Sequence, residues 1–359
     1  MFEQRGMIIA CAPRSRFPGL ITWLLVAAIS PSAQADLTSG PQYDALKSIH
    51  NATGGATWTD STNWASGDAC MWHGVGCDQD DPGNNASQVR YLSLSNNNLS
   101  GVLPDFSGLI YLINLDLNSN KLTGSFPDIS GMAALNGIDL SHNLLDGTIP
   151  AISGVPDLRN IVAGFNQLHG SLPCISPTAP CNSGLTSLSS LSLSTNLLTG
   201  VIPSFEGLDF QELDLSHNLL EGSIPPLDQL AGAAYIDLSA NRLTGQIPCL
   251  SPQAPCNSHF YQVATFNLES NALSGPIPPL AAMPFLRHLL LAGNSLTGPV
   301  PAAPIPTPGK TFDATLCPNP LDSVASANDA GWNAATGFTP WWTSGGGAVC
   351  DGIFASDFE

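Results

Sequence analysis

The sequence predicts an α/β solenoid of nine coils that stack through a short parallel β-sheet on their concave side. Three observations predict it: asparagine recurs at steps of 22, 23 or 30 residues, leucines stand at fixed offsets around it, and a glycine and a proline follow. The nine asparagines of this ladder are Asn97, Asn120, Asn143, Asn166, Asn196, Asn218, Asn241, Asn271 and Asn294. Such a recurrence marks an array in which every coil buries the same positions against the next.

Residues 1–35 have the pattern of a secretory signal peptide. Arg5, Arg14 and Arg16 precede the apolar run 20–29, and Ala33-Gln34-Ala35 supplies a cleavage site of the A-x-A type. The apolar run is short for a membrane span, although an uncleaved anchor is the alternative, and no later stretch reaches membrane length. We therefore expect cleavage after Ala35 and a secreted, extracellular protein with no stable membrane span.

Residues 36–87 do not follow the repeat and are expected to form an N-terminal cap. The stretch 43–50 has the spacing of a short amphipathic helix, and Trp58, Trp64 and the segment Cys70-Met71-Trp72-His73-Gly74-Val75-Gly76-Cys77 follow it. The first coil of an array needs such a cover, because its apolar edge would otherwise face water. The tryptophans are therefore interpreted as core residues of the cap, with ligand stacking as the alternative.

Residues 88–301 contain the nine repeats, each on the frame LxLxxNxLxGxIP. In Leu115-Asp116-Leu117 the leucines point one way and the aspartate the other, which predicts a short strand with one buried face. The turn out of such a strand leaves backbone N–H and C=O groups without a partner. An asparagine amide both donates and accepts, so the ladder is expected to satisfy those groups and to bond the neighbouring coil.

Residues 302–359 are expected to form a C-terminal cap and tail. Their tryptophans Trp332, Trp341 and Trp342 lie close together in the sequence. We interpret this cluster as a cover for the last coil or, alternatively, as a platform that stacks on a glycan.

The cysteines predict disulfides. Of nine cysteines, Cys11 leaves with the leader, and the other eight fall into sequence-local pairs. The pairs are Cys70 with Cys77, Cys174 with Cys181, Cys249 with Cys256, and Cys317 with Cys350. An even count in an exported chain predicts disulfides, whereas the histidines lack the spacing of a metal site. The second and third pairs staple two matching insertions, 174–183 and 249–258, which are length variants or, alternatively, rigid knobs for a partner.

These motifs resemble a known family. The LxGxIP half of the repeats, over about 89–301, and the cap motif W…CxWxGVxC are similar to those of plant-type leucine-rich repeat proteins. The resemblance implies a right-handed leucine-rich repeat superhelix with a concave sheet and disulfide-bonded caps, the second of which contains Cys317 and Cys350. Leader, cap, repeat subclass and cysteine count are together similar to the polygalacturonase-inhibiting proteins of plants. That similarity implies recognition or inhibition of a secreted glycoside hydrolase, or binding to a surface receptor.

The balance of charge and the absence of catalytic motifs exclude several functions. Lys and Arg number 10 against 28 Asp and Glu, a net charge of −18, so nucleic acid and anionic membranes are poor partners. No nucleophile elbow, HExxH, P-loop or dinucleotide-binding glycine motif is present. We expect a binding protein without enzymatic activity, cofactor or metal.

The concave face of the predicted sheet is the candidate binding surface. Its middle column runs Ser93, Asp116, Asp139, Val162, Ser192, Asp214, Asp237, Asn267 and Leu290. The aspartates form an acidic stripe for a cation or a basic partner, or they are the common filling of this frame in the resembling family. Aromatic and apolar side chains on a polar sheet are typical of binding hot spots. The predicted contact residues are Val162, Phe165, Tyr235, Asp214, Asp237, His288 and Leu290, while His142 and His217 are expected to be solvated.

The sequence thus favours a secreted monomer that recognises another protein through its concave face. The alternative is a carbohydrate-binding or cell-surface structural protein that uses Trp332, Trp341 and Trp342. A third hypothesis is ice or mineral binding by faces that are rich in Ser, Thr and Asn.

Overall fold

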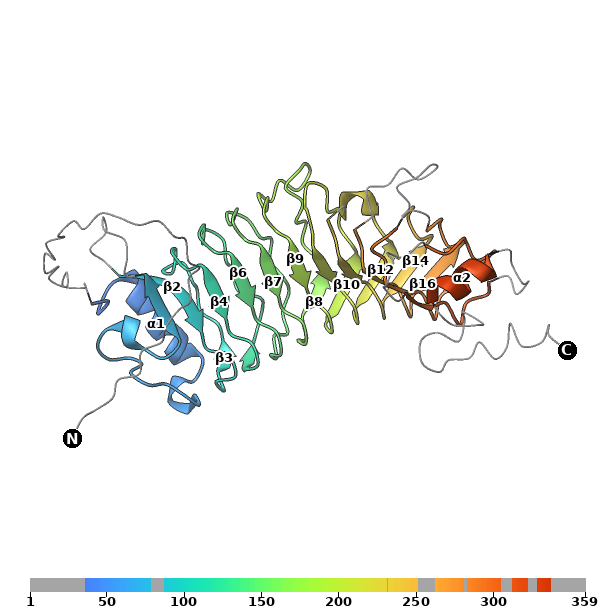
Figure 1. Cartoon of the computed structure of the whole chain (residues 1–359). Coiled ribbons are helices and arrows are strands. Elements are labelled where there is room, and N and C mark those ends of the chain that lie inside the picture. The colour runs from blue at the N-terminus through green and yellow to red at the C-terminus, as the bar shows by residue number, and fades with distance from the viewer. Residues whose placement is uncertain are drawn as a thin grey trace, which may run out of the picture. The chain divides into compact units, whose positions relative to one another are not determined.

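The computed structural model describes residues 36–78, 87–230, 232–250, 262–280, 283–304, 312–321 and 328–336. The predicted leader, 1–35, lies outside these ranges, as do Cys256, Cys350, Trp341 and Trp342. In the part that is described, no helix is long and apolar enough to cross a membrane. The predicted solenoid of nine coils with a parallel sheet is confirmed, and Figure 1 shows the coils following one another in chain order.

The N-terminal cap begins with helix α1 (Pro41–Ala52), which has a proline in its first turn and buries Leu46 and Ile49. The 3-10 helices η1 (Gly55–Thr57) and η2 (Ala69–Met71) follow. Trp58, Trp64 and Trp72 are buried and pack ring on ring, with centroids 4.8 and 4.9 Å apart. The interpretation of these tryptophans as core residues is therefore confirmed.

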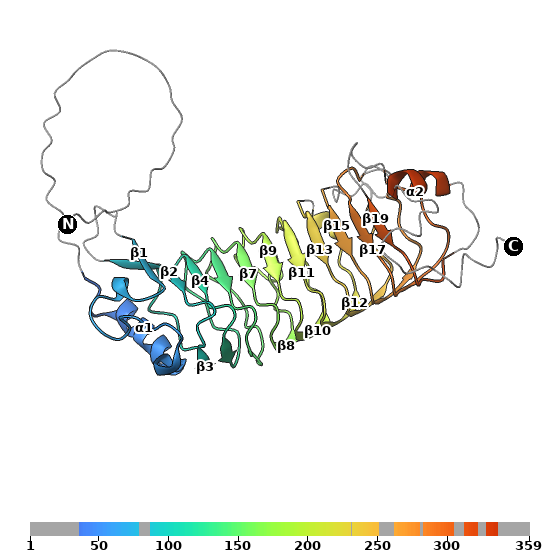
Figure 2. The same cartoon turned by 60° about the horizontal axis from the view of Figure 1, so that its bottom comes forward.

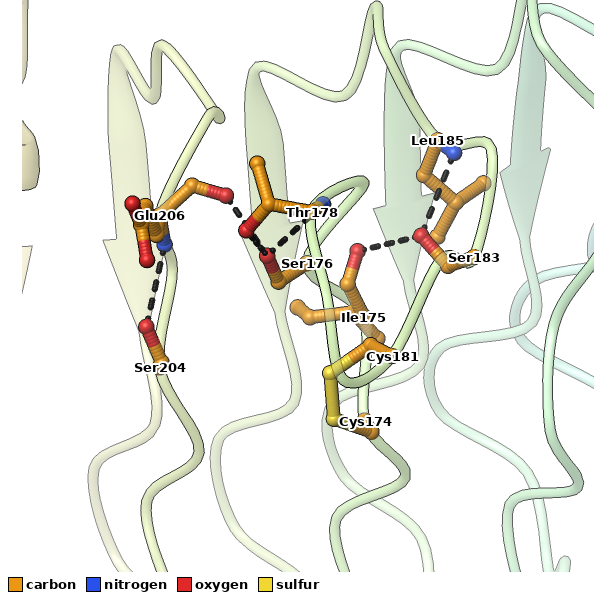
Figure 3. The surroundings of a disulfide bond; sticks show 9 residues. All are labelled: Cys174, Ile175, Ser176, Thr178, Cys181, Ser183, Leu185, Ser204 and Glu206. Atoms are coloured by element: carbon orange, nitrogen blue, oxygen red, sulfur yellow. Dashed lines mark hydrogen bonds between the residues drawn. A yellow bond between two sulfur atoms is a disulfide. The ribbon is translucent and has the colours of Figure 1, made fainter.

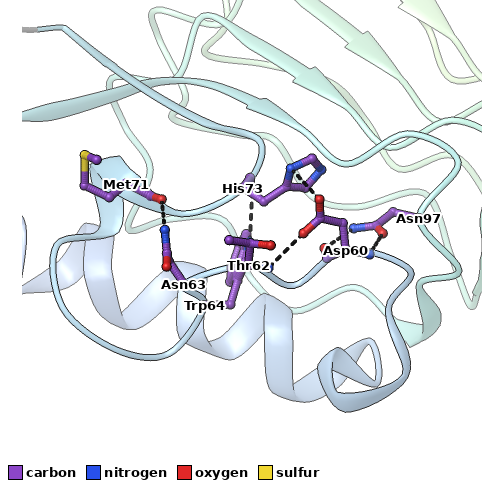
Figure 4. A network of polar contacts seen from close by, with 7 residues as sticks. All are labelled: Asp60, Thr62, Asn63, Trp64, Met71, His73 and Asn97. Atoms are coloured by element: carbon purple, nitrogen blue, oxygen red, sulfur yellow. Dashed lines mark hydrogen bonds and ion pairs between the residues drawn. The ribbon is translucent and has the colours of Figure 1, made fainter. Parts of the chain in front are cut away.

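A polar network joins this cap to the first coil (Figure 4). The first ladder residue, Asn97, donates from Nδ2 to the carbonyl of Asp60 at 2.8 Å and accepts from the Asp60 N–H at 2.6 Å. The Asp60 carboxylate in turn pairs with His73 at 3.2 Å. The first ladder asparagine is thus hydrogen-bonded to the cap, whereas the later ones are hydrogen-bonded to the preceding coil.

The long sheet contains eleven strands, of which nine belong to the repeats (Figure 2). In spatial order they are β1 (Val75–Asp78), β2 (Gln88–Ser93), β4 (Asn114–Asp116), β6 (Gly137–Asp139), β7 (Asn160–Val162), β9 (Ser190–Ser192), β11 (Glu212–Asp214), β13 (Tyr235–Asp237), β15 (Thr265–Asn267), β17 (His288–Leu290) and β19 (Asp313–Thr315). β1 is antiparallel to β2, and every other pair is parallel. The two caps therefore add one strand at each end of the predicted sheet.

A second sheet, which the sequence did not predict, forms from the LxG half of the repeats. Its six strands are β8 (His169–Ser171), β10 (Leu197–Val201), β12 (Leu219–Ser223), β14 (Arg242–Gly245), β16 (Ala272–Gly275) and β18 (Ser295–Leu296). A separate pair joins β3 (Ser100–Val102) to β5 (Lys121–Thr123), and a 3-10 helix, η3 (Leu227–Leu230), lies between β12 and β13. In β10, β12, β14 and β16 the second residue is a leucine that is buried, while the residues on either side of it are more exposed. The core therefore lies between the two sheets.

The asparagine ladder is confirmed as a structural element. Asn143, for example, donates from Nδ2 to the carbonyls of Leu117, on the preceding coil, and Leu140, both at 3.0 Å. Its Oδ1 accepts from the N–H of Leu122 at 3.0 Å. Asn319 in the C-terminal cap makes the same bonds, with Nδ2 2.8 Å from the Leu291 carbonyl, so the ladder has one rung more than predicted.

Disulfides join Cys70 to Cys77 and Cys174 to Cys181, as predicted. Cys249 and Cys317 are also disulfide-bonded, and their expected partners lie outside the described residues. Figure 3 shows the first insertion lying against the next coil, where Ser176 Oγ donates to the Glu206 carbonyl at 2.7 Å. The insertion contributes no strand to the long sheet.

The C-terminal cap ends, in the described residues, with helix α2 (Asp329–Thr336). Trp332 in this helix is fully buried, lies 5.6 Å from the Phe312 ring and donates from Nε1 to the Pro301 carbonyl at 2.8 Å. The interpretation of Trp332 as a cover for the last coil is therefore confirmed, and the alternative, in which it stacks on a glycan, is wrong for this residue. Trp341 and Trp342 are outside the described residues.

Candidate functional site

The face of the long sheet that points away from the core is the candidate site. We call it the long-sheet face and define it as the first and third residue of each three-residue strand segment plus the two residues before each ladder asparagine. The predicted middle column is confirmed, because the strand registers align Ser93, Asp116, Asp139, Val162, Ser192, Asp214, Asp237, Asn267 and Leu290. Thr315 of the C-terminal cap continues it.

The aspartates of the middle column stabilise the turns that end their own strands. Asp139 Oδ1 accepts from the backbone N–H of Ser141 at 2.9 Å and from its hydroxyl at 2.6 Å. Asp214 makes the same two bonds to Ser216, at 3.0 and 2.7 Å. An aspartate that accepts from the backbone two residues on forms an Asx turn. The common aspartate of this frame therefore has a structural role, whatever its charge does in addition.

No lysine or arginine neutralises these carboxylates within the described ranges. The ion pairs there are His73–Asp60, Arg90–Asp78 and His288–Asp313. The acids of the long-sheet face are Asp116, Asp139, Glu212, Asp214, Asp237, Glu269 and Asp313. Except for Asp313, these acids accept hydrogen bonds from neutral donors, such as Ser190 Oγ at 3.2 Å from Glu212 and the Thr315 hydroxyl on Glu269.

Tyr235 and Asp237 form a unit in the C-terminal half of the face. The Tyr235 hydroxyl donates to Asp237 Oδ2 at 3.2 Å, and Asn267 Nδ2 donates to the same oxygen at 2.9 Å. Burial, followed by the charges of Asp237 and Asp214, raises the pKa of Tyr235 well above its usual range, so the phenol stays neutral. Asp237 itself is buried, which corrects its prediction as a contact residue: it holds the hydroxyl of Tyr235, whose side chain is exposed.

Phe165 lies on the fourth of the nine repeats and is 50% exposed. Its ring stacks on that of His142 from the preceding coil, with centroids 4.3 Å apart and an interplanar angle of 9°. We call this pair the aromatic stack. His142 was expected to be merely solvated, and the structure shows that it is exposed but paired.

The backbone beneath the aromatic stack is left-handed. Every coil places the residue before its ladder asparagine in this region, with φ of 54° at His142, 57° at Phe165 and 55° at Thr195. Left-handed backbone is a genuine outlier for a bulky side chain and costs on the order of 1 kcal/mol. An aromatic side chain here gives up stability without filling the core.

The remaining predicted contact residues do not belong to the aromatic stack. Val162, on the same coil as Phe165 and in register between Asp139 and Ser192, is half-buried. His288, on the ninth repeat, pairs through Nδ1 with Asp313 at 3.3 Å, and Leu290 is half-buried two residues on. The predicted set is thus spread over three parts of the sheet.

Exposed aromatic and apolar side chains near the N-terminal end of the sheet were not predicted from the sequence. Tyr91 on β2 and Ile110 are exposed, and the Arg90 guanidinium lies 5.8 Å from the centre of the Tyr111 ring. Tyr91 belongs to the first column of the long-sheet face, so reading that column as closely as the middle one would have found it.

Among the described residues no cluster of metal-ligating side chains is found, and a small apolar void lies in the core. No group of three or more His, Cys, Asp or Glu side chains there converges on a common point. An apolar void of about 10 Å³ lies in the core between Ile149, Ile161, Leu172 and Ile175, which is no larger than one water.

Comparisons with known proteins agree with this fold. The Leucine Rich Repeat family matches residues 88–109, 111–132 and 209–229. A plant ice-binding protein of known structure is 26% identical, with a TM-score of 0.62, over 82% of this chain and 91% of that one. No curated protein sequence matches the chain.

Two plant receptor ectodomains are also similar. The peptide hormone receptor RGFR1, in complex with RGF2, is 28% identical over 62% of this chain with a TM-score of 0.53. The Arabidopsis receptor kinase HAESA, in complex with an IDA peptide hormone, is 26% identical over 79% of this chain with a TM-score of 0.51. The chain covers 36% and 54% of these two ectodomains.

Proposed function

We propose that this leucine-rich repeat solenoid is an exported protein that recognises another protein through its long-sheet face. The observation that carries the proposal is the aromatic stack of His142 and Phe165, which combines a 50% exposed phenylalanine ring with an exposed histidine on a largely polar sheet. The left-handed backbone is common to all nine repeats, but a bulky ring placed there and exposed to water costs stability without filling the core. Exposed aromatic side chains of this kind are typical of binding hot spots.

The comparisons support this proposal. RGFR1 and HAESA, which share the fold, have structures with peptide hormones. The leader pattern supports secretion. A narrower form of the proposal is inhibition of a secreted glycoside hydrolase, which rests on the similarity of leader, cap and cysteines to polygalacturonase-inhibiting proteins. We propose binding without catalysis, because the sequence contains no nucleophile elbow, HExxH, P-loop or dinucleotide-binding glycine motif.

Selection of displayed random peptides on the secreted chain tests the proposal. Phe165→Asn removes the exposed ring, and asparagine tolerates left-handed backbone, so the fold should stay intact. We expect selected peptides to lose binding to Phe165→Asn. The matched control is Leu197→Ser, which removes an equally exposed side chain from β10 in the second sheet. Peptides that bind the parent and Phe165→Asn equally well would refute the proposal.

Ice binding is the second candidate. It is favoured by the likeness to the plant ice-binding protein and by exposed hydroxyls on the second sheet, which pair across strands as Ser171 with Thr199 and Ser223 with Thr244. Thermal hysteresis that is lost in Thr199→Lys plus Thr244→Lys but kept in Phe165→Asn would establish this function.

A further inference from the structure

We infer that the partner of the long-sheet face is an extended, cationic peptide segment that carries an aromatic or large apolar residue. The inference rests on the proposed function and names the chemistry of its ligand. The basic residues would lie over the acidic stretch, which we define as Glu212, Asp214 and Glu269. The apolar residue would contact the aromatic stack of His142 and Phe165.

Charge is distributed unevenly over the solenoid. The long-sheet face from β2 to β19 contains no lysine or arginine, although it carries a carboxylate on most of its coils. The basic residues of the repeats stand elsewhere. Lys121 and Arg242 belong to the β5 and β14 strands, while Arg90, Arg159 and Arg287 each precede the first residue of the face on their coil. One face is therefore purely anionic, and a partner of the opposite sign fits it.

The carboxylates of the acidic stretch accept hydrogen bonds from neutral donors. Asp214 is held by Ser216, and Glu212 accepts from Ser190 Oγ at 3.2 Å. These donors are neutral, so they orient the carboxylates and leave the negative charge in place. An incoming ammonium or guanidinium group would not have to displace an ion pair, and hydrogen bonds to charged partners are the stronger kind.

The spacing of the coils matches the residue spacing of an extended peptide. Neighbouring parallel strands lie about 4.8 Å apart, so the coil of Phe165 and the coil of Asp214, two strands on, are separated by about 10 Å. An extended peptide that crosses the strands presents same-side residues about every 6.6 Å. An aromatic residue and a basic residue two to four positions apart therefore reach both features.

Synthetic peptides of defined charge test the inference. The first probe is a twelve-residue peptide with one tryptophan and lysines at the second and fourth positions after it; the second replaces the lysines by glutamate. Dissociation constants for the secreted chain come from fluorescence anisotropy at low and high salt. We expect the lysine peptide to bind more tightly, with an affinity that falls as salt is added.

Matched variants separate site binding from general attraction to an acidic protein. Asp214→Asn keeps the oxygen that accepts from Ser216, so it removes the charge and not the turn. It should weaken the lysine peptide by about two- to fivefold, and Phe165→Asn should also weaken it. Glu221→Gln removes one charge from the neighbouring second-sheet strand β12 and should change nothing.

The outcomes distinguish failure of the cationic-peptide inference from failure of the proposed function. Equal effects of Asp214→Asn and Glu221→Gln, or no preference for the lysine peptide, would overturn the cationic partner. Display-selected peptides that are neutral or acidic, yet depend on Phe165, would also overturn it while the proposed function stands. Selected peptides that ignore Phe165 would remove the proposed function itself.

Discussion

Asn143→Ala removes one rung of the asparagine ladder, and the structure sets its cost. The Leu122 N–H, which donates to Asn143 Oδ1 at 3.0 Å, loses its side-chain partner inside the core. The carbonyls of Leu117 and Leu140 each keep a second donor, from the neighbouring rungs Asn120 and Asn166. One orphaned donor costs about 1–3 kcal/mol, so we expect a loss near 2 kcal/mol in urea unfolding at an unchanged m-value.

Two further variants make the test specific to the ladder. Asn160→Ala changes an exposed asparagine on β7, outside the ladder, and should stay within about 0.5 kcal/mol of the parent. Asn143→Asp keeps an acceptor for Leu122 but cannot donate, and it sets a carboxylate against the carbonyls of Leu117 and Leu140. It should therefore cost more than alanine does. The reasoning is refuted if Asn143→Ala is as mild as Asn160→Ala, or if aspartate is tolerated.

Three more predictions concern stability and pH. Cys174→Ser combined with Cys181→Ser opens a short closed loop, which should cost about 2–3 kcal/mol; an unchanged melting temperature in calorimetry would contradict this. Trp332→Ala empties a fully buried site and should cost about 3–5 kcal/mol in urea unfolding, whereas a loss below about 1 kcal/mol would show that α2 does not cover the last coil. The hydroxyl and then the backbone N–H of Ser107 lower the pKa of Asp105 below its ordinary value of 3.8, so Ser107→Ala should raise that pKa in a carbon-13 NMR titration. Because the folded pKa is lowered, this carboxyl stabilises the fold above its unfolded pKa and loses that contribution as pH falls through the folded pKa; a pKa unmoved by Ser107→Ala would show that the hydroxyl is not its cause.

The sequence predicted the long sheet well because burial repeats once per coil. The middle column from Ser93 to Leu290 was aligned correctly, since the period-2 strand and the fixed distance to the asparagine leave one register that buries the leucines. The further rung Asn319 was also readable. It stands between Leu316 and Leu321 at the spacing of the frame, although the prolines on either side of it obscured the match.

The second sheet and the aromatic stack could not be predicted from the repeat pattern. The strands of the second sheet are short and most contain a glycine, so their pairing depends on how each coil is offset from the next. His142 and Phe165 occupy the same slot of consecutive coils, but stacking requires their coils to bring two rings within 4.3 Å. The burial of Trp332 likewise depends on the packing of α2 against Phe312, which the sequence does not reveal.

The sequence by itself thus determined the solenoid, its ladder and the side chains that line each column. Those features follow from local periodicity and from the need to pair backbone groups that leave water. Only the tertiary structure decided which carboxylates have no basic partner, that Asp237 is buried and bonded to the Tyr235 hydroxyl, and where two rings stack on the long-sheet face. Each of these depends on distances between coils, which the frame of a single repeat does not contain.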